Sequence, residues 1–230
     1  WMDFSYELSK HYPEEYAAGM SMVRSAERAI LEQDESRFLK IFELLKNYPE
    51  TGALELTDQI AFGNRLAWIM ADQMMLFDHA TDVIDFTVVK FQLHEESLQW
   101  RNELGAMIYD TQANIFEKLN ETEKALEAYG LALDYFEQPE TLLRRGLILE
   151  TKNDLEGALE DYITALGLAP SQVTIIQKVK DVYSKLNPDD DPQKFLKDIQ
   201  ESLQERRKEE VLSEVFDIVA PDFQITDFNG

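Results

Sequence analysis

Residues 106–171 decide the fold, because they contain one pattern of residues twice: AMIYDTQANIFEKLNETEKALEAYGLALDYFEQPETLLRRGLILETKNDLEGALEDYITALGLAPS. Each copy has helical spacing of bulky and small residues, then a short polar turn and a second helical segment. The first copy is Tyr109-x2-Gln112-Ala113-x2-Phe116 with Ala125-x3-Tyr129-x2-Ala132, and the second is Leu142-x2-Arg145-Gly146-x2-Leu149 with Ala158-x3-Tyr162-x2-Ala165-x4-Pro170. An internal repeat of this length predicts stacked helical hairpins.

Small residues recur where two helices of one hairpin would cross. Ala113 and Gly146 occupy matching places in the first helices, and small side chains there allow the second helix to approach closely. Tyr129 and Tyr162 occupy matching places in the second helices, where a ring would fill the space between hairpins. The pattern therefore predicts an all-α protein with buried tyrosines at these two positions.

The repeated pattern resembles the tetratricopeptide repeat (TPR). The second copy is the closer match because it keeps the closing Pro170, whereas Pro139 is displaced from that place in the first copy. The resemblance implies an α-solenoid of antiparallel helical hairpins over residues 96–171. It also implies a module that binds proteins and is not itself an enzyme.

Both flanks continue the helical periodicity without the full pattern. Residues 1–95 are interpreted as diverged helical hairpins, in which Asp34 and Thr57 cap helices. Residues 82–93 mix helical spacing with β-branched side chains and are predicted to be helical. Trp68 and Trp100 are expected to lie in the core, and Leu39 is expected to face inward.

Residues 172–219 are interpreted as a degenerate capping repeat followed by a C-terminal helix. Lys180 stands where the pattern wants a small residue, which suits a unit whose outer face meets water. Asp191 before Pro192 predicts an N-cap followed by a first-turn proline. From residue 96 onward, helices are expected near residues 96–118, 122–136, 140–152, 154–168, 171–186 and 192–216.

TPR proteins often present the first helix of each hairpin on a concave face, which implies a partner-binding groove here. Its expected members from the first copy are Met107, Asp110 and Asn114, with Glu140, Leu143, Arg144 and Leu147 from the second copy and Thr174, Gln177 and Lys178 from the degenerate unit. Members that bind a C-terminal carboxylate use Lys, Asn and Arg. Asp110 and Glu140 stand where that clamp wants bases, and only Asn114 and Arg144 fit. The groove is therefore expected to take a peptide or a neighbouring domain instead.

The net charge of −23, from 45 acidic and 22 basic residues, restricts the partners. Nucleic acid and anionic lipid would be repelled, and a basic partner would be attracted. The same acidity also serves to keep a helical surface soluble. No apolar run is long enough to insert into a membrane. There is no cysteine, so zinc-thiolate sites, disulfides and thiol catalysis within this chain are excluded.

His79 lies between Asp78 and Asp82, at helical spacing that could hold a divalent metal ion. The alternative interpretation is a helix C-terminus with a favourable histidine beside solvated acids. No catalytic triad, phosphate-binding glycine loop or zinc motif is present, and no cofactor is expected. A metal-dependent enzyme module is the least favoured of the functional hypotheses.

Residues 220–230 form a short tail with an extended pattern that ends in a hairpin signal, Asn229-Gly230. The segment Ala220-Pro221-Asp222-Phe223 resembles the start of redoxin domains, the thioredoxin-fold peroxiredoxins and thiol–disulfide reductases. That resemblance implies that the chain docks partners for a longer redox protein whose catalytic cysteines lie beyond residue 230. Its own C-terminal redox domain is one candidate partner. The same resemblance favours an extracytoplasmic location such as the bacterial periplasm. A free-standing TPR scaffold is the alternative, and the oligomeric state is left open.

Overall fold

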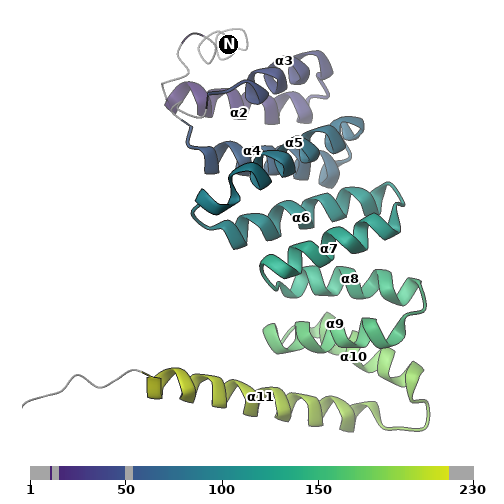
Figure 1. The fold of residues 1–230 in the computed structure, drawn as a ribbon. Coiled ribbons are helices and arrows are strands. Elements are labelled where there is room, and N and C mark those ends of the chain that lie inside the picture. Colours follow the sequence, from purple (N-terminus) through teal and green to yellow (C-terminus); the bar gives the residue numbers. More distant parts are fainter. Residues whose placement is uncertain (1–10, 12–15, 50–53, 218–230) are drawn as a thin grey trace, which may run out of the picture. The chain divides into compact units, whose positions relative to one another are not determined.

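The computed structural model describes residue 11 and residues 16–49 and 54–217, which form helices joined by turns (Figure 1). No β-strand occurs in these ranges. The chain divides into two compact units, residues 1–148 and 149–230, with the division inside one helix. The fold class is all-α, of the TPR-like solenoid type built from antiparallel helical hairpins, as the repeat predicts.

In the described residues, the first unit contains three helical hairpins and the greater part of a further helix. Its elements are α2 (Tyr16–Leu31), α3 (Glu35–Lys46), α4 (Leu56–Gln73), the 3-10 helix η1 (Phe77–His79), α5 (Ala80–His94), the 3-10 helix η2 (Glu95–Ser97), α6 (Arg101–Lys118), α7 (Thr122–Tyr135) and most of α8 (Pro139–Thr151). Helix α2 packs on α3, α4 on α5 and α6 on α7, and α4 also packs on α6. One continuous core therefore extends from α2 to α7.

The second unit contains the end of α8 and three further helices, α9 (Leu155–Leu168), α10 (Val173–Leu186) and α11 (Pro192–Asp217). Helix α10 packs against both α9 and α11. Tyr183 of α10 stacks on Phe195 of α11, with the ring centroids 3.7 Å apart. The far half of α11 is largely exposed, since Val211 and Leu212 both face solvent within the described residues.

Three interhelical turns share one geometry. Each has a non-glycine residue in the left-handed region, Gln33, Asn120 or Asn153, with φ between 55° and 62°. In each turn the next amide donates a 2.9 Å hydrogen bond to the carbonyl five residues earlier: Asp34 to Ala29, Glu121 to Phe116 and Asp154 to Leu149. Asparagine tolerates this conformation better than most residues, which explains its presence in the two repeat copies.

The tyrosines and alanines that match between the second helices of the two repeat copies are buried as predicted. Ala125 and Tyr129 lie in the first unit and are fully buried, as are Ala158 and Tyr162 in the second. Gly105 shows how closely the helices pack, because a methyl group there would lie 2.7 Å from the ring of Tyr135. Close approach between helices thus depends on residues with little or no side chain.

Several local predictions are confirmed. Asp34 caps α3 by accepting a 3.1 Å hydrogen bond from the amide of Arg37. Asp191 likewise accepts a 2.8 Å bond from the amide of Gln193 at the start of α11. Residues 82–93 are helical within α5, whose β-branched residues Val83 and Ile84 are fully buried. None of the described helices is long and apolar enough to cross a membrane.

The predicted positions of the two tryptophans and of Leu39 are wrong. Trp68 is 46% exposed because its neighbours Ala67 and Ile69 supply the core-facing positions of α4. Trp100 is 65% exposed and has a φ of 62°, since it is the N-cap of α6 rather than part of a helix. Leu39 is also exposed, because Phe38 and its neighbours fill the inner face of α3. Aromatic character alone did not indicate burial at either tryptophan.

Two predicted helix starts are also wrong. Helix α4 begins at Leu56 with Glu55 as its N-cap, so Thr57 lies inside the first turn. Helix α6 begins at Arg101 and not at residue 96, because the chain forms the short 3-10 helix η2 and then becomes extended at Leu98. The tail predicted at residues 220–230 lies outside the described residues.

Candidate functional site

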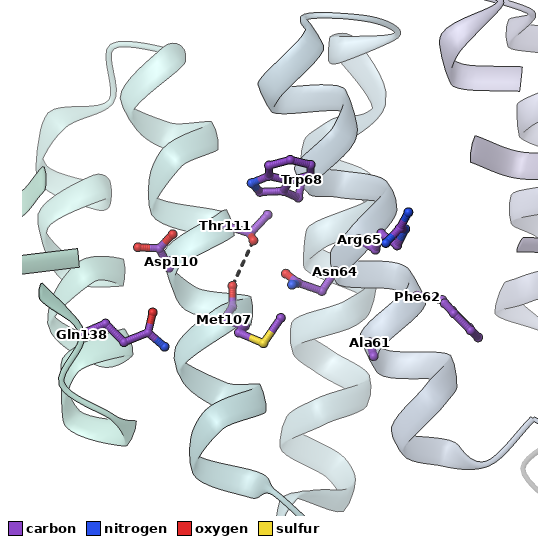
Figure 2. Close-up of a pocket in the computed structure, with 9 residues that line it drawn as sticks. All are labelled: Ala61, Phe62, Asn64, Arg65, Trp68, Met107, Asp110, Thr111 and Gln138. Carbon is purple, nitrogen blue, oxygen red and sulfur yellow. Dashed lines mark hydrogen bonds between the residues drawn. The ribbon is translucent and has the colours of Figure 1, made fainter. Parts of the chain in front are cut away.

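A pocket of 440 Å³ opens in the first unit between α4 and α6 (Figure 2). Its lining comes from α4, from α6 and from the residue just before α8. The lining residues are Ala61, Phe62, Asn64, Arg65, Trp68, Met107, Asp110, Thr111 and Gln138. The volume falls within the range of about 300–1,000 Å³ that is usual for small-molecule ligand pockets.

Two large apolar side chains form the exposed walls of the pocket. Trp68 of α4 is 46% exposed and Met107 of α6 is 50% exposed. Ala61, Asn64 and Trp68 recur at helical spacing along α4, which places them on the side of the helix that meets α6. An aromatic ring and a polarisable thioether at a pocket mouth are typical of surfaces that bind a partner.

Asn64 supplies a buried hydrogen-bond acceptor that the described protein does not use. The residue is 4% exposed, and its Oδ1 atom has no hydrogen-bond partner. Figure 2 shows its amide group directed toward α6, close to Thr111 and Met107. Since buried polar atoms are nearly always paired, an unpaired acceptor beside a pocket favours a ligand that brings a donor.

Asp110 of α6 contributes a carboxylate to the lining of the pocket. Its Oδ1 accepts a 2.8 Å hydrogen bond from the hydroxyl of Thr141. Burial raises the pKa of Asp110, while the hydrogen bond from Thr141 and the positive charge of Arg144 oppose that rise. The charges of Glu117 and Glu140 raise the pKa further, although each contributes less than the opposing charge of Arg144.

A tyrosine, Tyr129, links α6 and α7 of the first unit. The hydroxyl of Tyr129 donates a 3.0 Å hydrogen bond to Oε2 of Glu117. The Arg144 side chain also hydrogen-bonds this hydroxyl. Burial and the charge of Glu117 raise the pKa of Tyr129, so the phenol stays protonated. Arg144 is therefore held by the protein and does not project freely into a groove.

The second unit contains a related arrangement around Glu150, whose side chain is 13% exposed. This carboxylate accepts hydrogen bonds from Tyr162 at 2.9 Å, from Lys178 at 2.8 Å and from Lys185 at 2.7 Å. Burial alone would raise the pKa of Glu150, but the bonds from the two lysines and the tyrosine outweigh it and lower the pKa to about 2. The cluster joins the end of α8 to α9 and α10.

The structure places two of the predicted groove residues, Met107 and Asp110, in the pocket. The third residue of the first copy, Asn114, is buried and does not line it. Of the others, Leu143 is partly buried, while Arg144 and Leu147 are on the surface of α8. Gln177 hydrogen-bonds Asp181 at 2.7 Å, and Lys178 is paired with Glu150.

Sequence reasoning missed the α4 side of the pocket. Asn64, Arg65 and Trp68 lie outside the repeat pattern, so the family resemblance pointed elsewhere. One available signal was a second stripe on α4, in which Ala61, Asn64 and Trp68 follow helical spacing apart from the apolar core positions.

His79 does not form the metal site considered from the sequence. Its Nε2 lies 2.8 Å from Oε1 of Glu35, and its ring is 6.0 Å from that of Phe38. Within the described part of the chain, no three His, Asp or Glu side chains group closely enough to hold a metal ion. In agreement with the alternative, His79 is the last residue of a helix, the 3-10 helix η1, and the chain then leads directly into α5.

Comparison with known proteins identifies one repeat. The family model of the tetratricopeptide repeat matches residues 139–172, which contain α8, the Asn153 turn and α9. No curated protein matches the chain. The chain thus contains a tetratricopeptide repeat within an all-helical fold, and such repeats are non-catalytic modules for protein–protein interaction.

Proposed function

We propose that this chain binds a protein partner and that the pocket between α4 and α6 receives a segment of that partner. The observation that carries the proposal is the unpaired Oδ1 of Asn64 beside two exposed apolar walls, Trp68 and Met107. Such a site can bury apolar surface of a ligand and at the same time satisfy a buried polar atom.

A peptide segment fits this pocket better than a flat protein surface would. The pocket is concave and lies between α4 and α6. Its polar groups come from both helices, for example Asn64 from α4 and Asp110 from α6. One side chain of a peptide, together with its neighbouring backbone, could contact the apolar walls and the polar groups of the pocket at the same time. Interfaces of this type gain most of their affinity from a few residues in a desolvated pocket.

The hairpins before residue 96 are proposed to be diverged copies of the same repeat. The turn at Gln33 has the same left-handed residue and the same 2.9 Å hydrogen bond as those at Asn120 and Asn153. This similarity supports a common hairpin unit for α2 with α3. The capping role proposed for residues 172–219 is supported by the exposed outer part of α11.

A more specific proposal links the chain to redox chemistry, and it depends on the resemblance of residues 220–230 to redoxin domains. According to this proposal, the helical region belongs to a thioredoxin-fold protein and binds either partner proteins or the redox domain of the same chain. A scaffold unrelated to redox chemistry is the alternative. Sequencing the gene beyond codon 230 distinguishes them, because a Cys-x-x-Cys motif or a peroxidatic cysteine is required by the first and not by the second.

Selection of peptides from a displayed random library tests the pocket. We expect selected peptides to lose most of their affinity for Trp68→Ala and Met107→Ala chains, because each change removes a wall of the pocket. Leu93→Ala is the matched control, since Leu93 is exposed on α5 outside the pocket lining. Equal binding to all four chains, measured by fluorescence anisotropy, would show that the pocket is not the site.

A further inference from the structure

We infer that the pocket between α4 and α6 recognises an arginine side chain in a basic partner segment. This inference rests on the proposed function and adds the chemistry of the ligand to it. Three features of the pocket lining support it: hydrogen-bond acceptors without donors, the acidic residues around Asp110 and the exposed ring of Trp68.

The acceptors of the pocket require donors from the ligand. Oδ1 of Asn64 is buried and unpaired. At Asp110, Thr141 occupies Oδ1, and no hydrogen bond to Oδ2 is found in the described structure. A guanidinium group carries five N–H donors and no acceptor, so it can satisfy oxygens of this kind. A carboxylate ligand would leave both acceptors unpaired.

The charges around Asp110 favour a cation. Glu117 and Glu140 act on it from α6 and α8. Arg144 is the opposing positive charge, and its side chain also hydrogen-bonds the Tyr129 hydroxyl. Arg65 is the one basic residue in the pocket lining, and it is paired with Glu27. Figure 2 shows its side chain directed away from Asp110. The acids near the pocket therefore outnumber the bases that could neutralise them.

The walls distinguish arginine from lysine. A planar guanidinium stacks on an indole such as the half-exposed Trp68, and its aliphatic stem can contact the Met107 side chain. An ammonium group is compact and strongly hydrated, so it gains less from the same surface. The net charge of −23 would also speed the approach of a basic segment at low salt.

The test uses three synthetic hexapeptide libraries that differ only at a fixed central residue, which is arginine, lysine or the neutral isostere citrulline. We expect the arginine library to bind the whole chain at least about tenfold more tightly than the citrulline library. Lysine is expected to fall between them. Added salt should reduce the difference between arginine and citrulline.

Variants locate the effect within the pocket. Asp110→Asn keeps the size of the side chain and an oxygen for Thr141 but removes the charge, so it should abolish most of the preference for arginine over citrulline. Asp134→Asn, an exposed acid on α7 outside the pocket lining, should leave the preference unchanged.

The outcomes separate the two proposals. Binding that is lost in Trp68→Ala but shows no arginine preference would overturn the present inference and leave the peptide site standing. Binding of arginine peptides that is unaffected by both Trp68→Ala and Asp110→Asn would overturn both. An equal loss in Asp134→Asn and Asp110→Asn would show that only the overall charge attracts the peptide, which also overturns the inference.

Discussion

The tyrosine of each repeat copy donates a hydrogen bond to a glutamate, but the two glutamates have different surroundings. In the first unit Tyr129 bonds an exposed Glu117 at 3.0 Å, and Arg144 binds the tyrosine hydroxyl. In the second unit Tyr162 bonds a mostly buried Glu150 at 2.9 Å, and two lysines bind the carboxylate directly.

The two copies therefore share their packing, whereas the charged residues around the tyrosine have different roles. In the second unit the bases neutralise the carboxylate and hold three helices together. In the first unit Arg144 interacts with the Tyr129 hydroxyl and with the charges of Glu117 and Asp110, and Asp110 lines the pocket. In the second unit the charges therefore serve stability, whereas the carboxylate of Asp110 in the first unit is the group that we propose to meet a ligand.

The largest expected effect tests what the two copies share. Tyr129→Ala and Tyr162→Ala should each reduce the free energy of unfolding by about 3–5 kcal/mol, because each removes a fully buried ring and leaves a cavity. Urea denaturation followed by circular dichroism measures both. A cost below about 1 kcal/mol for either variant would contradict the shared packing role.

The next effect separates the copies. Glu150→Gln should cost about 1–3 kcal/mol, because Lys178 loses its charged partner in a mostly buried cluster. Glu117→Gln should cost less than about 1 kcal/mol, since that carboxylate is exposed. Glu160→Gln on α9 is the control for removing an exposed acid from the second unit. Equal costs at Glu117 and Glu150 would remove the distinction between the units.

A pH series refines that distinction. The pKa of Glu150 falls from the ordinary value of 4.5 to about 2 in the folded chain, so folding favours its ionised form. The resulting stability is fully present above pH 4.5 and is lost as the pH falls through about 2. The difference in unfolding free energy between the unmodified chain and Glu150→Gln should therefore shrink over that range. A constant difference would show that the ionised carboxylate is not what stabilises the unit.

The smallest expected effect concerns the turns. Asp154 caps α9 by accepting a 3.1 Å hydrogen bond from the amide of Gly157, whereas Glu121 makes no side-chain cap on α7. Asp154→Ala should cost about 1 kcal/mol and Glu121→Ala close to nothing. Conversely, Glu121→Asp should stabilise α7 by a few tenths of a kcal/mol, which thermal unfolding can detect. Equal effects of the two alanine changes would mean that the Asp154 cap contributes no stability.

The repeated residues predicted much of the fold because their roles are local. Spacing along a helix fixes which side chains share a face, so burial of Tyr129 and Tyr162 followed from the pattern. The capping aspartates were equally visible, since a cap involves residues only a few positions apart. The prediction for Thr57 failed because the N-cap of α4 is Glu55, two residues earlier.

The candidate site was only half predictable. Met107 and Asp110 follow from the family resemblance, because they lie on the first helix of a recognisable copy. Asn64 and Trp68 do not, since α4 lacks the repeat pattern and a lone tryptophan suggests core as readily as surface. Their role depends on how α4 packs against α6.

The all-α class, the hairpin unit, the acidic composition and the exclusion of thiol chemistry from this chain follow from the residues alone. The packing of the helices was needed to show that Oδ1 of Asn64 has no hydrogen-bond partner, that Trp68 forms a wall of the pocket and that Glu150 binds two lysines. The two kinds of feature differ in how far apart along the chain the interacting residues lie. Helical periodicity and capping act within a few residues, whereas a pocket or an ion cluster requires side chains from separate helices to meet.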